Sequence, residues 1–111
     1  MKKLKKLWPL FLSLTILVIL IILIANQPKT ILFYGDVCPH CQNVEDYLEK
    51  NPSTVKFRHL EVYRNRQNSV LMESKAKLCG LETDSVGVPF LFDGKNCLIG
   101  DTNIINWFQQ Q

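Results

Sequence analysis

Apolar and polar residues follow several distinct patterns along this chain, and the first of them is a long stretch without charge. LWPLFLSLTILVILIILIA, at 7–25, contains only Ser13 and Thr15 as polar residues. A helix of this length, at about 1.5 Å per residue, spans roughly 28 Å, which is close to the ~30 Å hydrocarbon core of a bilayer. The pattern predicts a transmembrane helix, and its length and lack of charge make a buried helix of a soluble domain a weaker interpretation.

The flanks of this stretch predict how it sits in a membrane. A cleaved signal peptide has an apolar core of ~7–15 residues and small residues before its cleavage site. The core here is longer, and the bulky Leu23 lies two residues before Ala25, which is the only candidate site. We therefore expect an uncleaved, single-pass anchor in the cytoplasmic membrane. The basic segment 1–6 predicts a cytoplasmic N-terminus and a C-terminal domain on the outer side.

After a short linker at 26–29, the pattern changes to that of an α/β domain at 30–111. TILFY, at 30–34, is almost continuously apolar, as in a buried central strand. From Cys41 onward apolar residues recur at helical spacing, until an Asn-Pro pair ends the helix. The alternating segment 54–63 predicts a second strand.

The second half of the chain predicts a polar helix, a hairpin and a last helix. The predicted elements are a helix at 66–79 closed by Gly80, strands at 88–92 and 96–100 joined by a turn at Asp93 and Gly94, and a last helix capped by Asp101, with Ile104, Ile105 and Phe108 on its apolar face. The predicted order is β-α-β-α-β-β-α.

The charge distribution removes one class of function. The net charge is +3, but Lys2, Lys3, Lys5 and Lys6 supply four of the 13 positive charges. The other nine, all beyond position 28, face ten acidic residues in the same region. The predicted domain is therefore nearly neutral, and it has no basic surface for binding nucleic acid.

Cys38 and Cys41, in the sequence CPHC, are the main candidates for chemistry. A zinc site needs four ligands, and Cys79, Cys97 and the histidines lack the spacing to complete one. A purely structural bridge between cysteines three apart would constrain little of the unfolded chain. We therefore predict a redox-active pair and no metal.

The position of the pair at a predicted helix start explains the redox interpretation. Unpaired N–H groups and the helix dipole stabilise a thiolate there, and they can lower a thiol pKa from about 8.5 to ~3.5–7.5. Cys38 is therefore the predicted nucleophile. Cys41, one turn further, is the predicted resolving thiol. Pro39 fixes the first turn, and His40 is expected to tune the reduction potential, with a solvent-exposed filler as the alternative.

These motifs resemble those of the thioredoxin superfamily, and within it the small glutaredoxin-like form, over about 30–108. The resemblance rests on a strand leading into CPHC, on GVPFLF at 87–92 with its hairpin, and on IGD at 99–101 before the last helix. CPHC itself is typical of the DsbA family of periplasmic oxidases. The resemblance implies a three-layer α/β sandwich around a four-stranded mixed sheet. It also implies a cis Pro89 facing the dithiol, with the backbone beside it at Val88 pairing with substrate.

Two departures from the family pattern affect the expected chemistry. Thioredoxins carry a buried acid where this chain has Leu32, which points away from a thioredoxin proper. Glutaredoxins commonly carry, where this chain has Gly35, a lysine that meets a carboxylate of glutathione. We expect no cofactor, and the missing lysine argues against glutathione as a co-substrate, although Gly100 and Asp101 could form part of such a site.

Cys79 and Cys97 leave two interpretations open. In an oxidising compartment they can form a structural disulfide, which at a separation of 18 residues is worth about 3 kcal/mol. They can equally remain buried thiols that behave as small apolar residues.

Together the patterns predict a membrane-anchored thiol–disulfide oxidoreductase. Its partners would be extracytoplasmic protein thiols or disulfides and a separate protein that recycles the dithiol. The alternative is a non-catalytic binding domain of the same fold, which would use Cys38 and Cys41 as soft ligands for copper or another thiol-binding ligand.

Overall fold

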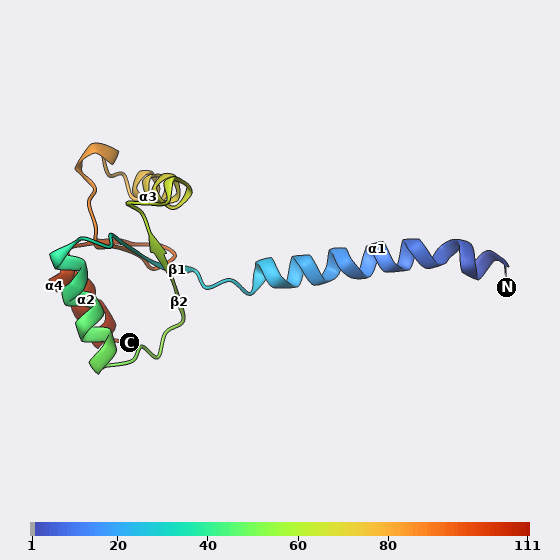
Figure 1. Ribbon diagram of the computed structural model, residues 1–111, viewed down its shortest axis with the longest axis horizontal. Coiled ribbons are helices and arrows are strands. Elements are labelled where there is room, and N and C mark those ends of the chain that lie inside the picture. Colours follow the sequence, from blue (N-terminus) through green and yellow to red (C-terminus); the bar gives the residue numbers. More distant parts are fainter. Residues whose placement is uncertain (1) are drawn as a thin grey trace.

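A computed structural model describes residues 2–111, so Met1 of the basic segment lies outside it. A long helix, α1 (Lys2–Ala25), extends away from an α/β domain (Figure 1). None of the residues of α1 is buried, and its length and composition would allow it to cross a membrane. The helix includes the lysines that precede the predicted span, because lysine is itself a good helix former.

The domain is built on a four-stranded mixed sheet. Its strands are β1 (Thr30–Tyr34), β2 (Phe57–Glu61), β3 (Phe90–Phe92) and β4 (Cys97–Ile99), in the spatial order β2-β1-β3-β4. Strand β1 pairs in parallel with β2 and antiparallel with β3, and β3 pairs antiparallel with β4. The two central strands are therefore β1 and β3, which are also the most apolar.

Helices cover both faces of this sheet. They are α2 (Pro39–Lys50), α3 (Arg66–Leu78) and α4 (Asp101–Gln109), with a short 3₁₀ helix, η1 (Thr83–Ser85), that the sequence pattern did not predict. Helices α2 and α4 pack together on one face, and α3 lies on the other (Figure 1). The predicted three-layer α/β architecture and the order β-α-β-α-β-β-α are confirmed.

The alternation of side chains along β1 divides the core into two clusters. Ile31 and Phe33 face α3, where they pack with Met72 and Ala76. Leu32 points to the opposite face and packs in the cluster that α2 and α4 cover. That second cluster also contains Val44, Leu91, Ile104 and Phe108. Because β1 is buried on both faces, its sequence is apolar at nearly every position.

Several predicted boundaries differ from the structure, because strands β2 and β4 are shorter at both ends than predicted and α3 ends one residue earlier. Strand β2 begins at Phe57 rather than at 54, because the Ser53 hydroxyl exchanges hydrogen bonds with the backbone of Val55 and holds the chain in a turn. Strand β3 begins at Phe90 rather than at 88. The expected cap of the last helix was wrong by one residue: Gly100, at φ 90°, is the N-cap, and Asp101 is the first residue of α4.

Candidate active site

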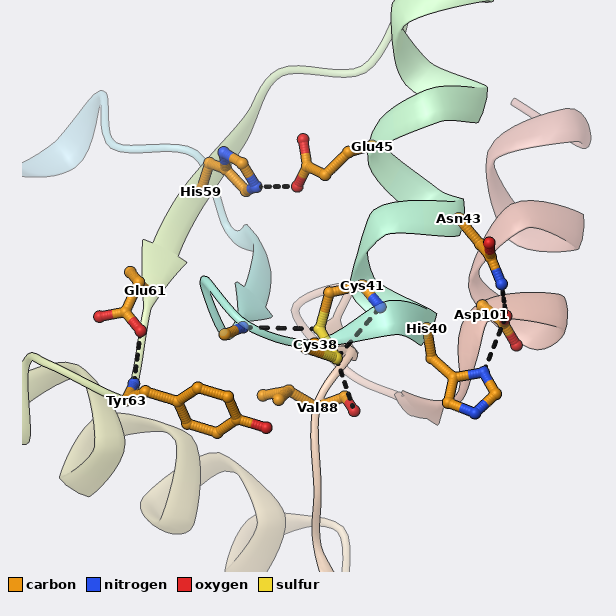
Figure 2. The surroundings of a disulfide bond; sticks show 11 residues. Cys38, His40, Cys41, Asn43, Glu45, His59, Glu61, Tyr63, Val88 and Asp101 are labelled. Atoms are coloured by element: carbon orange, nitrogen blue, oxygen red, sulfur yellow. Dashed lines mark hydrogen bonds and ion pairs between the residues drawn. A yellow bond between two sulfur atoms is a disulfide. The ribbon is translucent and has the colours of Figure 1, made fainter.

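Cys38 and Cys41 lie where β1 has ended and α2 begins. Cys38 is the N-cap of α2, with extended backbone, and Pro39 is the first helical residue. The Cys41 backbone N–H donates to the Cys38 Sγ at 3.1 Å, and the two sulfurs form a disulfide (Figure 2). Cys41 is only 2% exposed, whereas Cys38 is partly exposed. The pair thus presents one accessible sulfur and one buried sulfur.

Two further backbone segments, one at Gly35 and one at Val88, lie against these sulfurs. The Gly35 N–H points at the Cys41 Sγ at 3.5 Å, and the Val88 carbonyl oxygen lies 3.7 Å from the Cys38 Sγ. The Val88–Pro89 peptide bond is cis, and Pro89 is fully buried. The Gly100 N–H donates to the Pro89 carbonyl and thereby ties this turn to the start of α4. The segments around 88 and 100 are therefore brought to the dithiol together.

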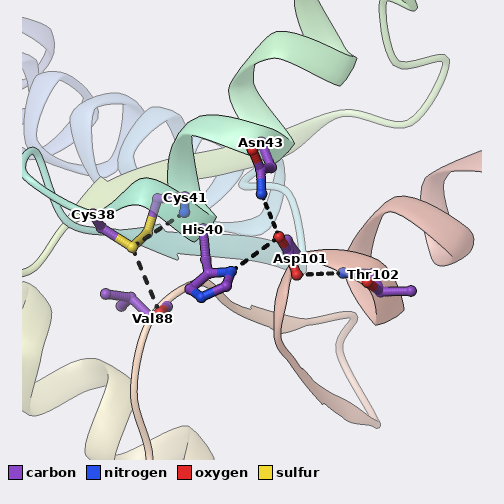
Figure 3. Close-up of polar contacts among 7 residues, drawn as sticks. All are labelled: Cys38, His40, Cys41, Asn43, Val88, Asp101 and Thr102. Carbon is purple, nitrogen blue, oxygen red and sulfur yellow. Dashed lines mark hydrogen bonds and ion pairs between the residues drawn. A yellow bond between two sulfur atoms is a disulfide. The ribbon is translucent and has the colours of Figure 1, made fainter.

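A polar cluster lies beside the dithiol and joins α2 to α4 (Figure 3). Asp101 accepts hydrogen bonds through Oδ2 from Asn43 Nδ2 at 2.6 Å and from His40 Nδ1 at 3.1 Å. Its Oδ1 accepts from the Thr102 N–H at 2.9 Å. The Asn43 hydrogen bond, followed by that of His40, lowers the pKa of Asp101 to about 2. Asp101 is thus a fixed anion at neutral pH.

Replacing Asn43 by alanine is expected to raise the pKa of Asp101 toward its ordinary value of 3.8, because the Asn43 hydrogen bond contributes most to the shift. Since the folded-state pKa is the lower one, Asp101 adds stability above about pH 4, and that stability is lost as the pH falls through about 2. NMR titration of the Asp101 side-chain carboxyl, in the wild-type protein and in Asn43→Ala, measures the two pKa values. An unchanged Asp101 midpoint in Asn43→Ala would contradict it.

Gly35 leaves the space that the Tyr63 ring occupies next to the dithiol. A Cβ at position 35 would overlap that ring. Figure 2 shows the ring between β2 and Val88, and Tyr63 remains 56% exposed. The position where glutaredoxins commonly carry lysine is thus next to an aromatic surface, and no side chain fits there without moving the ring.

Gly35→Ala is expected to destabilise the domain by about 1–3 kcal/mol, the usual range for overpacking a filled site. In a Tyr63→Ala background the same change should cost less than half as much, because the overlapping ring is absent. Urea unfolding of the four chains measures this coupling. Equal costs in the two backgrounds would show that some other neighbour opposes the new methyl group.

Cys79 and Cys97 are joined by a second disulfide, with their Cα atoms 6.2 Å apart. It links the end of α3 to β4 and packs against the core cluster on the α3 face of the sheet. Cys41, in contrast, lies on the helix of the opposite layer. The second disulfide is therefore placed to connect a helix to the sheet.

Several neighbours of the site were not found from the sequence. Asn43 had a usable signal, because it lies one helical turn after His40 and therefore on the same face of α2. Tyr63 had none, since its position depends on how the chain turns after β2. His59 lies on β2, with its ring stacked on Tyr34 at 4.0 Å and its Nε2 bonded to Glu45.

Among residues 2–111, no three His, Cys, Asp or Glu side chains are grouped so that they could hold a metal ion. The site itself presents two neighbouring sulfurs at a helix N-terminus.

Comparisons with known proteins define the class of fold. No family model and no curated protein sequence matches the chain. Solved structures do: the chain has a thioredoxin/glutaredoxin-like α/β fold. One such structure is the holo form of glutaredoxin C1 from Populus tremula x tremuloides, with a TM-score of 0.52, 20% identity and 77% of each chain covered.

A second similar structure is the glutaredoxin grx-1 from Archaeoglobus fulgidus. It aligns with a TM-score of 0.53 and 14% identity, over 78% of this chain and 91% of that one. Because both sequence identities are low, these similarities establish the fold alone.

Proposed function

We propose that this protein is a membrane-anchored thiol–disulfide oxidoreductase that exchanges disulfides with extracytoplasmic protein thiols. The observation that carries the proposal is the sulfur pair at the start of α2, in which Cys38 is partly exposed and Cys41 is buried. The glutaredoxin-like fold supports the same class of chemistry.

In the oxidising direction, a substrate thiolate attacks the Cys38 Sγ. The Cys38–Cys41 bond breaks, Cys41 leaves as a thiolate, and a mixed disulfide joins Cys38 to the substrate. A second substrate thiolate then attacks the substrate sulfur, and Cys38 leaves as a thiolate. Two electrons thus pass from the substrate to the dithiol. In the reducing direction, the Cys38 thiolate attacks a substrate disulfide and Cys41 resolves the product.

Local groups favour the accessible sulfur as the attacking and leaving group. The Cys41 N–H already points at the Cys38 Sγ, and Cys38 caps the positive end of the α2 dipole. Both stabilise negative charge on that sulfur. Cys41 is shielded from a bulky substrate, which suits a thiol that reacts only within the chain.

Substrate backbone would pair beside Val88 and Pro89. This turn lies against the Cys38 sulfur, and the Val88 carbonyl faces it. Gly100 and Asp101 adjoin the same turn through the Gly100–Pro89 hydrogen bond. A substrate held there as an added strand would bring its own sulfur into line with Cys38.

The anchor would place this site away from the bilayer. Helix α1 is followed by a short linker and then by β1, which at about 3.3 Å per residue runs roughly 15 Å before the loop to Cys38. In Figure 1 the start of α2 lies on the side of the domain opposite α1. A recycling partner and protein substrates would both approach from that side.

A lipid-quenching experiment tests this placement. In vesicles containing brominated acyl chains, a fluorophore on Cys38 of the Cys41→Ser chain should be quenched little. The same fluorophore on Lys29→Cys, in a chain with both dithiol cysteines replaced by serine, should be quenched strongly, because position 29 follows α1 closely. Equal quenching at the two positions would contradict an outward-facing site.

The reduction potential of the Cys38–Cys41 pair tests the proposed activity. The full chain, in detergent micelles, would be equilibrated with glutathione or dithiothreitol buffers, and the oxidised fraction measured after thiol alkylation. A midpoint near or above about −180 mV would identify a disulfide donor or isomerase, and one near −230 mV or below would identify a reductant. Absence of any defined two-electron equilibrium would overturn the proposal.

A further inference from the structure

The carboxylate of Asp101 is held by donors from two helices. Asn43 and His40 on α2 both donate to Oδ2, and the Thr102 N–H at the start of α4 donates to Oδ1. Asp101 is only 21% exposed, although the His40 side chain that reaches it is 73% exposed. The acceptor is therefore fixed in space, while its imidazole partner has room to move.

This contact determines which nitrogen of His40 carries hydrogen. Asp101 remains ionised at neutral pH, and an ionised carboxylate can only accept. The hydrogen between the two groups must therefore sit on Nδ1. Figure 3 shows the imidazole turned toward Asp101, on the side of the cluster away from Asn43. Since Nδ1–H is engaged, the ring is oriented by α4 and not by the dithiol.

The same contact changes what His40 offers to the sulfur. His40 lies in the first turn of α2, two residues after Cys38, where a hydrogen-bond donor aimed at the sulfur would stabilise the Cys38 thiolate. Asp101 engages the Nδ1–H at 3.1 Å, so this donor does not reach the sulfur. Asp36, the acidic residue two positions before Cys38, is paired with Arg64 and not with His40.

We propose that Asp101 is a positioning residue that holds His40 through Nδ1 and turns this hydrogen-bond donor away from the Cys38 sulfur, which makes the dithiol less oxidising than it would be with His40 released. This inference rests on the proposed function, since it concerns the potential of the same pair. It assigns the direction of the effect: releasing His40 should favour the reduced, thiolate form.

The test compares midpoint potentials of full-length chains in detergent micelles. Asp101→Asn is expected to raise the equilibrium constant for reduction of the dithiol by about tenfold, equivalent to about 30 mV. Asp46→Asn is the matched control, because it removes a charge from α2 at an exposed residue that bonds to Gln42 and not to His40. It should change the constant by less than about twofold.

A double-mutant cycle separates an effect through His40 from a direct effect of charge. In a His40→Ala background, Asp101→Asn should change the constant by less than about twofold. A tenfold rise in that background, an equal rise for Asp46→Asn, or a constant that stays the same or falls in Asp101→Asn would each overturn the inference.

Imidazole ¹⁵N shifts give a readout that does not depend on redox activity. In the oxidised wild-type chain, with the imidazole neutral, His40 should carry hydrogen on Nδ1, and this preference should weaken in Asp101→Asn. Hydrogen on Nε2 in the wild type would overturn the inference. A wild-type chain without a two-electron equilibrium would instead refute the proposed function, so the two failures are distinguishable.

Discussion

Cys38→Ser is expected to abolish disulfide exchange, lowering the rate by roughly 10³-fold or more, because it removes the sulfur that substrates can reach. Cys41→Ser should have a different effect. Its accessible Cys38 still attacks a substrate disulfide, but no resolving thiol releases the product, so a mixed disulfide accumulates. Reduction of a disulfide-linked peptide measures the rate, and non-reducing gels with mass spectrometry detect the trapped species.

A chain with both substitutions is the control for trapping. Cys79 and Cys97 remain, but their sulfurs are paired with each other, so this chain should capture no substrate. The assignment of roles depends on the difference between the single variants. If Cys38→Ser trapped substrate as efficiently as Cys41→Ser, the buried sulfur would be the reactive one, and the roles would have to be exchanged.

Replacing Cys79 and Cys97 together by alanine is expected to lower the free energy of unfolding by about 3 kcal/mol. The disulfide closes a loop across 18 residues, and its loss gives the unfolded chain more conformations. It also frees the end of α3 from β4, a short strand at the edge of the sheet. Urea unfolding of the full chain in detergent micelles, followed by the fluorescence of Trp107, measures the change.

Replacing Cys38 and Cys41 by alanine provides the comparison. Their separation is three residues, so the loop-closure effect is smaller, and the loss of stability should be smaller too. This second chain has no Cys38–Cys41 pair to reduce, so only its stability is compared. A larger loss from the dithiol replacement than from the Cys79 and Cys97 replacement would contradict a structural role for the second disulfide.

The sequence by itself determined the order of the elements and the main chemical candidates. The apolar run at 30–34 predicted β1 with its observed bounds, and the helical spacing after Cys41 predicted α2. These succeed because strand and helix periods are local properties of neighbouring residues. The placement of Cys38 at a helix N-terminus followed from the same local pattern, since the apolar strand stops shortly before it.

Only the tertiary structure decided which distant residues meet at the site. His40 and Asp101 are 61 positions apart, and they touch because α4 packs against α2. The approach of Tyr63 to Gly35 depends on the path of the chain after β2. Such contacts depend on how whole elements pack, and the local alternation of apolar and polar residues carries no information about their partners.

The two cysteine pairs show the same division. The spacing of Cys38 and Cys41 brings their sulfurs together within one helical turn, so a local pattern was enough to predict their pairing. Cys79 and Cys97 could be read as a disulfide or as two buried thiols. They pair because α3 covers one face of the sheet and ends beside β4. Local sequence fixes the geometry of one turn, whereas packing between layers decides which remote side chains can react or bind together.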